Sequence, residues 1–244
     1  LAASLTYSFR GSFYNFHYFT AGYHNTWIHK DVIQEKPNYF THDDQKLKYF
    51  LASYRYRHDN RDNVSYATHG TMLDASLTKY GMFGNDDIDE LEFSIMASKY
   101  NKLGDKFHFA TGISGSAFFS DNQPYTLVRG IGYKPDFIRG YELNVIEGQQ
   151  LIAHKNSLRY EILDIAYDIS DIMPIDEFSV FPIKLYLSGN FDHGYVRDAN
   201  RLPLNAALTN KYLLGYGLGL DLIGMYSVNN MGTGSFFVNV KAPI

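Results

Sequence analysis

The clearest pattern in the chain is a strict alternation of bulky apolar residues with glycines between residues 212 and 222. One row is apolar and the other is small or charged: Tyr212, Leu214, Tyr216, Leu218, Leu220 and Leu222 against Gly215, Gly217, Gly219 and Asp221. Successive side chains of a β-strand point to opposite faces of the sheet. The segment therefore has one face suited to lipid and one nearly bare face that tolerates a charge, which predicts a membrane-spanning strand.

The same alternation recurs in four other segments, so the pattern predicts an architecture. These segments are residues 90–97, 106–114, 157–162 and 181–192. In each of them an apolar row faces a row of mixed small, polar and charged residues. A water-soluble sandwich would carry its charge on the outside and its apolar residues inside. The mixed polar rows instead suit a water-filled or plugged interior, and we expect an all-β protein that forms a transmembrane antiparallel β-barrel.

About ten strands are expected along the chain. They lie near residues 2–10, 16–28, 46–57, 70–80, 89–99, 105–119, 151–163, 180–192, 212–226 and 234–241. The connections alternate between short (11–15 and 100–104) and long (29–44, 120–149 and 193–211), as in barrels with short periplasmic turns and long outer loops. The loop 120–149 is longer than a compact domain normally leaves unstructured. This length predicts that the loop is functional or folded into the lumen.

Composition narrows the possible classes of function. The chain has 21 Tyr and 18 Phe among 244 residues, and tyrosine suits an interface because its ring is apolar and its hydroxyl is polar. No run approaches the roughly 18 apolar residues of a membrane helix, so any spanning must be done by strands. The absence of Cys excludes thiolate metal sites. With a net charge of −4 and scattered Lys and Arg, nothing predicts nucleic-acid binding.

The direction of the strands raises a question of topology. If 11–15 and 100–104 are periplasmic turns, the first strand runs inward from outside the cell and the last strand ends outside. A barrel with both termini in the periplasm would then need a strand before Leu1 and another between Tyr226 and Gly232. We therefore expect residues 1–244 to be the incomplete C-terminal barrel domain of a longer protein, with a break in the chain at Tyr226–Ser227.

Three motifs between about Tyr54 and Ile244 resemble the BamA/TamA superfamily of outer-membrane barrels, of the bacterial surface antigen type. The likeness is strongest to the TamA-like members of Bacteroidetes. The motifs are Tyr56-Arg57-His58-Asp59-Asn60-Arg61-Asp62 with Ala67-Thr68-His69-Gly70, then Phe137-Ile138-Arg139-Gly140-Tyr141-Glu142, and Phe191-Asp192-His193-Gly194-Tyr195-Val196. Two departures occur: Ala67 stands where the family usually has Pro, and no residue separates Phe191 from Asp192.

The resemblance implies a barrel of 16 strands, with periplasmic modules upstream of this domain. It also implies that the loop carrying Arg139, Gly140, Tyr141 and Glu142 folds back into the barrel. Between Gly217–Leu222 and Phe236–Ile244, whose sequences also look like the C-terminus of the family, a further strand is normally present. In the family, the turn containing Asp59, Arg61, Asp62 and Gly70 is periplasmic and structural.

The pairing of a loop arginine inside the lumen can also be expected from the chemistry of the guanidinium group alone. Such a guanidinium needs a matched partner, and it is suited to carboxylate pairing. Asp192 and Glu161 have lumenal parity on their strands, so we expect Arg139 to pair with Asp192, with Glu161 nearby. Gly140 would permit a tight approach, and Tyr141 would pack against the wall. The alternative is a solvated loop arginine without a fixed partner.

Catalytic and metal motifs are poorly supported. Ser76-Leu77-Thr78-Lys79 formally matches Ser-x-x-Lys, but it lies on an alternating strand where chance explains it better. The nine His residues lack the paired spacing of a metal site. For Asp59, Arg61 and Asp62 a structural turn is favoured over a binding surface. We expect no enzyme activity, no metal and no cofactor.

The function implied by the resemblance is the assembly or translocation of other proteins at the bacterial outer membrane. The expected partners are outer-membrane lipid, client outer-membrane or exported proteins, and periplasmic or envelope accessory proteins. A weakly paired seam between the first and last strands would template incoming strands. Two alternatives stay open: a passive outer-membrane channel, and a barrel that anchors an enzyme domain fused upstream.

Overall fold

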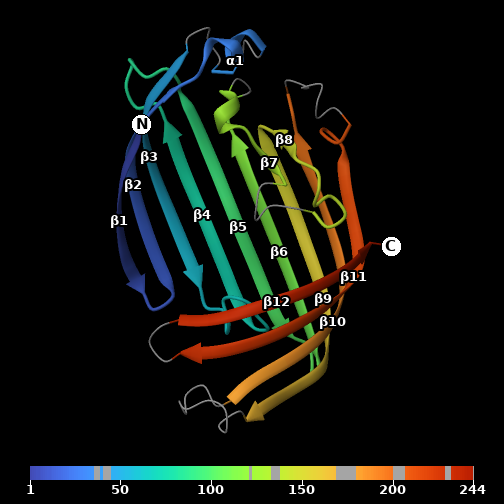
Figure 1. Ribbon diagram of the computed structural model, residues 1–244. Coiled ribbons are helices and arrows are strands. Elements are labelled where there is room, and N and C mark those ends of the chain that lie inside the picture. The colour runs from blue at the N-terminus through green and yellow to red at the C-terminus, as the bar shows by residue number, and fades with distance from the viewer. Residues whose placement is uncertain are drawn as a thin grey trace.

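Ten strands follow one another in chain order within a single antiparallel sheet in the computed structural model (Figure 1). They are β1 (Ala2–Ser12), β2 (Asn15–Trp27), β3 (Lys46–Asp59), β4 (Gly70–Tyr80), β5 (Glu90–Lys102), β6 (Phe107–Phe118), β9 (Gln150–Asp168), β10 (Val180–Arg197), β11 (Tyr212–Val228) and β12 (Gly232–Pro243). The structure describes residues 1–35, 39–40, 45–120, 123–132, 138–168, 180–199, 207–228 and 232–243. Each expected strand is present at its expected place, so the predicted antiparallel barrel wall is confirmed.

The remaining elements are short and lie at the ends of the strands. They are the helix α1 (Lys30–Glu35), the 3-10 helix η1 (Tyr125–Leu127), and a hairpin of β7 (Arg129–Ile131) with β8 (Ile146–Gly148). Among the described residues, no helix has the length and apolar character needed to cross a membrane.

The wall curves so that its late strands bend across the lower part of the molecule toward the first strands (Figure 1). Strands β1 and β12 form the two edges of the sheet, and no pairing between them occurs in the described part of the chain. The α1 segment and the β7–β8 hairpin gather at the upper end. The turns β1–β2, β3–β4 and β5–β6 lie at the lower end, called the turn end below.

The two faces of the wall differ as the alternation predicts. On β11 the apolar row is exposed, with Tyr212 at 64%, Leu218 at 52% and Leu220 at 43% of the accessible surface. The opposite row is covered, since Leu213 is 2% and Asp221 is 8% exposed. A row of exposed Leu and Tyr on a regular strand is stable against lipid and costly against water. The expected outer and lumenal faces of β11 are therefore assigned correctly.

Strand β11 continues through Tyr226 and Ser227 to Val228, and it pairs with β12 from Gly217↔Pro243 to Val228↔Gly232. The expected break at Tyr226–Ser227, and the extra strand expected between Tyr226 and Gly232, are therefore wrong. The register explains the error: only positions 229–231 separate the paired ends, which is the length of a hairpin loop. Residues 229–231 themselves lie outside the described residues.

The orientation of the wall can be tested by placing a charge on each face. Replacing Leu187, which is 41% exposed on the outer face of β10, by Lys should destabilise the folded protein in bilayers by about 2–4 kcal/mol. Ser94→Lys, on the lumenal face of β5, should cost much less because its ammonium reaches the wet interior. Urea unfolding of both variants in lipid vesicles measures the difference, and equal losses of unfolding free energy would contradict the assigned faces.

Candidate functional site

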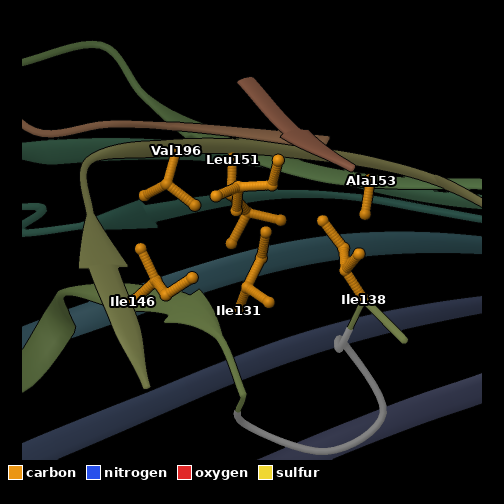
Figure 2. Close-up of a cluster of buried hydrophobic side chains, with 7 residues drawn as sticks. Ile131, Ile138, Ile146, Leu151, Ala153 and Val196 are labelled. Carbon is orange, nitrogen blue, oxygen red and sulfur yellow. The ribbon is translucent and has the colours of Figure 1, made fainter. Parts of the chain in front are cut away.

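The loop between β6 and β9 lies against the lumenal face of the late strands through a small apolar cluster (Figure 2). Ile131, Ile138 and Ile146 of the loop are each at most 1% exposed. They meet four side chains of β9, β10 and β11: Leu151, Ala153, Val196 and Leu213. Tyr141 of the loop packs against the same cluster. Burial of these side chains favours one fixed position of the loop against the wall.

Glycines in the wall allow the loop backbone to approach closely. A Cβ atom at Gly215 would lie 1.8 Å from the carbonyl oxygen of Arg139. A Cβ atom at Gly194 would lie 2.5 Å from Cδ1 of Ile138 and 2.6 Å from the carbonyl oxygen of Ile152. Any larger residue at either position would push the loop away. The glycine row of β11 therefore includes a position, Gly215, against which the loop backbone packs.

Gly140 has a different role from the one expected. A Cβ atom there would meet nothing within 4 Å, so the prediction of a tight approach at Gly140 is wrong. Its backbone φ is +89°, a left-handed conformation that glycine adopts easily and other residues rarely do. The turn at this point is closed by a hydrogen bond of 2.9 Å from the Tyr141 amide to the carbonyl oxygen of Ile138. Glu142 accepts a hydrogen bond of 2.8 Å from the Gly140 amide.

The guanidinium of Arg139 lies against the carboxylate of Asp192 on β10. Nη1 of Arg139 is 2.7 Å from Oδ1 of Asp192, and the backbone amide of Arg139 is 3.2 Å from Oδ2. Asp192 is 0% exposed and the Arg139 side chain is 21% exposed. Both oxygens of a buried carboxylate are therefore satisfied by the same loop residue.

Neighbouring polar groups of β9 and β10 complete the surroundings of Arg139. Nη2 of Arg139 donates to the hydroxyl of Ser157 at 3.1 Å, and that hydroxyl donates to Oδ1 of Asn190 at 2.6 Å. Burial lowers the pKa of Arg139 below the usual guanidinium value, although the charge of Asp192 opposes this shift. A desolvated charge is stable only when it is paired and hydrogen-bonded. The loop and the wall thus hold each other in place.

Glu161, expected near Arg139, makes a different contact. Its carboxylate accepts a hydrogen bond of 2.9 Å from the hydroxyl of Tyr186 on β10. The charged groups that act on Arg139 are Asp192, Arg159, Asp221 and Glu142. Strand parity places Glu161 on the lumenal face as expected, but parity alone does not fix height along the barrel.

The β3–β4 turn is closed by the charged residues that the sequence singled out. Nη2 of Arg61 lies 2.7 Å from Oδ2 of Asp59, and Asp62 accepts hydrogen bonds from the amides of Thr68 and His69 at 3.0 and 3.1 Å. Burial alone would raise the pKa of Asp62, but these hydrogen bonds together lower it. Gly70 has a φ of +105° where the chain enters β4.

The same turn also crosses the lumen, which the sequence analysis missed. The hydroxyl of Tyr66 donates to Oδ2 of Asp221 on β11 at 3.1 Å, and the carbonyl oxygen of Ala67 accepts from Nη1 of Arg159 at 2.9 Å. The Arg159 guanidinium lies 4.2 Å from the centre of the Tyr66 ring. Burial is the main cause that raises the pKa of Tyr66. The lone Asp221 in the glycine row was the only sequence signal for this contact.

Two features of the lumen therefore connect distant parts of the wall. The loop anchors on β9, β10 and β11 near Asp192, and the β3–β4 turn anchors on β9 and β11 near Asp221. Among the described residues, no group of three or more His, Cys, Asp or Glu could hold a metal ion. The arrangement is suited to holding the loop and the β3–β4 turn in place against the wall.

Removing one partner of the buried pair should be costly. Asp192→Ala leaves the guanidinium of Arg139 desolvated without its carboxylate, and the expected loss is about 3 kcal/mol or more of unfolding free energy. The double variant Asp192→Ala with Arg139→Met removes that orphaned charge and should recover part of the loss. As a control, Asp74→Ala breaks a pair with Arg55, whose side chain is 46% exposed, and should cost about 1 kcal/mol or less. Additive losses in the double variant would contradict a coupled pair.

The packing of the loop backbone against Gly215 gives a second test. Gly215→Ala should displace the loop, because its new methyl group would overlap the carbonyl oxygen of Arg139. Gly189→Ala is the matched control, since its Cβ atom would meet only Leu218 Cδ2 at 4.0 Å. Limited proteolysis of folded protein in bilayers should cleave the loop 120–149 several times faster in Gly215→Ala than in Gly189→Ala. The same rate in both variants would show that the loop does not rest on Gly215.

Comparison with known proteins shows a likeness in fold to one solved structure. No protein-family model matches the chain, and no curated protein matches it. Among solved structures, it is similar to the crystal structure of BamA from Haemophilus ducreyi lacking POTRA domains 1-3, with a TM-score of 0.61 and 15% sequence identity. The match covers 100% of this chain and 51% of that one, so the chain spans about half the length of the BamA chain. The assignment to TamA-like members of Bacteroidetes stays a prediction, and what the likeness shows is that the chain has a BamA-like barrel fold.

Proposed function

We propose that the chain is the outer-membrane barrel of a protein that inserts or exports other proteins, without enzymatic chemistry of its own. The observation that carries this proposal is the loop fixed in the lumen by Arg139 and Asp192 on a BamA-like wall. Fixing a loop inside the barrel supports a role in handling other chains more than a role in bulk diffusion. The finer assignment to the TamA-like branch rests on the sequence motifs.

The passive channel is the main alternative. A channel needs an open lumen, and it would be favoured by a loop outside the pore with Arg139 in bulk water. Arg139 is instead paired with a fully buried carboxylate, and the β3–β4 turn reaches Asp221 across the lumen. Both contacts fill space that a diffusing solute would need, which supports a plugged barrel.

The edge strands support a mechanism for handling clients. Within the described part of the chain, all eleven residues of β1 are exposed and β1 pairs with β2 only, so β1 is one edge of this sheet. Backbone N–H and C=O groups at a sheet edge are a template for pairing with another chain. Leaving such groups unpaired in lipid is costly. A client strand that adds to β1 would satisfy them, and this would favour strand insertion at this edge.

The proposal includes the location and the partners of the protein. The barrel would lie in the bacterial outer membrane, in contact with its lipid, and would receive unfolded client proteins. Periplasmic or envelope accessory proteins would deliver these clients. An anchor for a fused enzyme is the second alternative, and the complete reading frame of the gene distinguishes periplasmic repeats from a hydrolase domain.

Site-specific photocrosslinking tests the role of the β1 edge. A photoreactive phenylalanine analogue replaces Tyr7 on β1, which is 66% exposed, or Phe93 on β5, which is 38% exposed and faces the same way. Both changes keep an aromatic ring on the outer face, so folding should be unaffected. During synthesis of outer-membrane proteins, the analogue at position 7 should capture client chains at least several-fold more than the analogue at position 93.

The outcome separates the candidate functions. Equal capture at both positions, or none at either, would contradict client insertion at this edge. Swelling of vesicles that contain the purified barrel tests the channel directly: sugar uptake at a rate typical of open porins would favour the passive channel instead.

A further inference from the structure

A trough with a volume of about 710 Å³ lies on the outer face of the wall, across strands β4 to β11. Its apolar part includes Leu73, Ala97, Ile113 and Ile152, and the tyrosines Tyr195 and Tyr212 lie at its β10–β11 end. Ile113 is 38% and Ile152 is 48% exposed on the face assigned to lipid. The trough therefore opens toward the bilayer rather than the lumen.

A row of polar side chains crosses this apolar surface, which is unusual for a wall that faces lipid. Strand pairing places Lys99 of β5 beside Thr111 of β6, Thr111 beside Asn156 of β9, and His154 of β9 beside His193 of β10. All of these residues have outer parity. On β9 the residues before and after this row, Ile152 and Leu158, are apolar and exposed.

Hydrogen bonds connect the row into a directed relay. The amide of Asn156 donates to the carbonyl oxygen of Phe191 at 3.3 Å, so its Oδ1 is the acceptor for the hydroxyl of Thr111 at 2.8 Å. Thr111 Oγ1 must then accept from Nε2 of His154, at 2.9 Å. In a neutral imidazole, Nδ1 of His154 then accepts from Nε2 of His193, at 2.8 Å. Each step follows from the donor and acceptor inventory of these side chains.

The relay satisfies its own members, and two polar groups, one at its end and one beside it, are available to a ligand. Within the part of the chain that the structure describes, neither Nδ1 of His193 nor Nζ of Lys99 forms a hydrogen bond or an ion pair. Both residues line the trough, and no Asp or Glu does. Lys99 lies three positions from Lys102, the last residue of β5, and so near the turn end of the wall. A lysine there can extend its ammonium to the membrane interface.

We propose that the trough is a binding site for an anionic phospholipid. The phosphate is held by the ammonium of Lys99 near the turn end, and one acyl chain lies over Ala97, Leu73 and Ile113. Two features commit the site to this occupant: the trough opens into lipid, and the only charged side chain among the residues that line it is a cation. Basic groups beside apolar clefts recognise lipid phosphates in this way.

Native mass spectrometry of the full chain in detergent tests the site with phosphatidylglycerol and, for comparison, phosphatidylcholine. The wild-type barrel should retain one phosphatidylglycerol molecule with at least about fivefold preference over phosphatidylcholine. Lys99→Gln should abolish this preference. Lys102→Gln is the matched control, because Lys102 is an exposed lysine of the same strand that does not line the trough; it should bind like the wild type.

A second variant tests the apolar part of the site. Ala97→Phe fills the floor of the trough with a residue that a lipid-facing wall tolerates. This variant should no longer retain a lipid of either headgroup. Heat-modifiable migration on gels should show that it still folds. Retention of phosphatidylglycerol by Lys99→Gln and Ala97→Phe at the wild-type level would overturn the proposal, and so would a mass that shows a second copy of the chain in place of lipid.

Client capture at Tyr7 does not involve Lys99, so failure of the lipid site leaves the insertion proposal standing, and failure of client capture leaves the lipid site standing.

Discussion

Every strand residue of this protein must suit either lipid or the lumen, and the rest of the structure depends on that constraint. The backbone of a spanning segment satisfies its hydrogen bonds internally because the hydrocarbon offers no partners. In an antiparallel sheet this leaves only the choice of side chain, which alternates along each strand. Leu218 and Leu220 face outward at 52% and 43% exposure, while Asp221 beside them is 8% exposed. One strand thus separates two solvents.

The lumen follows a second rule, since groups buried there must be paired or hydrogen-bonded. Arg139 and Asp192 satisfy each other, and Tyr66 and Asp221 form a similar contact between the β3–β4 turn and β11. Small residues make these approaches possible, because Gly215 and Gly194 leave room for the loop backbone and Ile138. The glycine row of β11 therefore serves the plug as well as the wall.

The alternation predicted the ten strands and their faces because burial on one side of a regular strand has a period of two. Parity also placed Asp192 on the lumenal face, whereas the entry of the Arg139 loop into the lumen was implied only by the family resemblance of its motif. It could not place Glu161, because height along the barrel depends on register, and register comes from pairing between strands. The crossing of the lumen by Tyr66 and the close approach at Gly215 were not predictable, since both depend on how a turn or a loop folds back. The extent of β11 was also misjudged, because pairing with β12 continues past Tyr226.

The most direct measurement of the central claim uses the absence of cysteine from the chain. Single cysteines placed in turn at each position from 214 to 222 of β11, in protein folded into lipid vesicles, are treated with a small water-soluble maleimide and with a lipid-soluble one. A wall between lipid and lumen predicts a period of two: even positions react with the lipid-soluble reagent, while odd positions are shielded from it. Reaction without alternation, or with the even positions reactive only to the water-soluble reagent, would contradict the account.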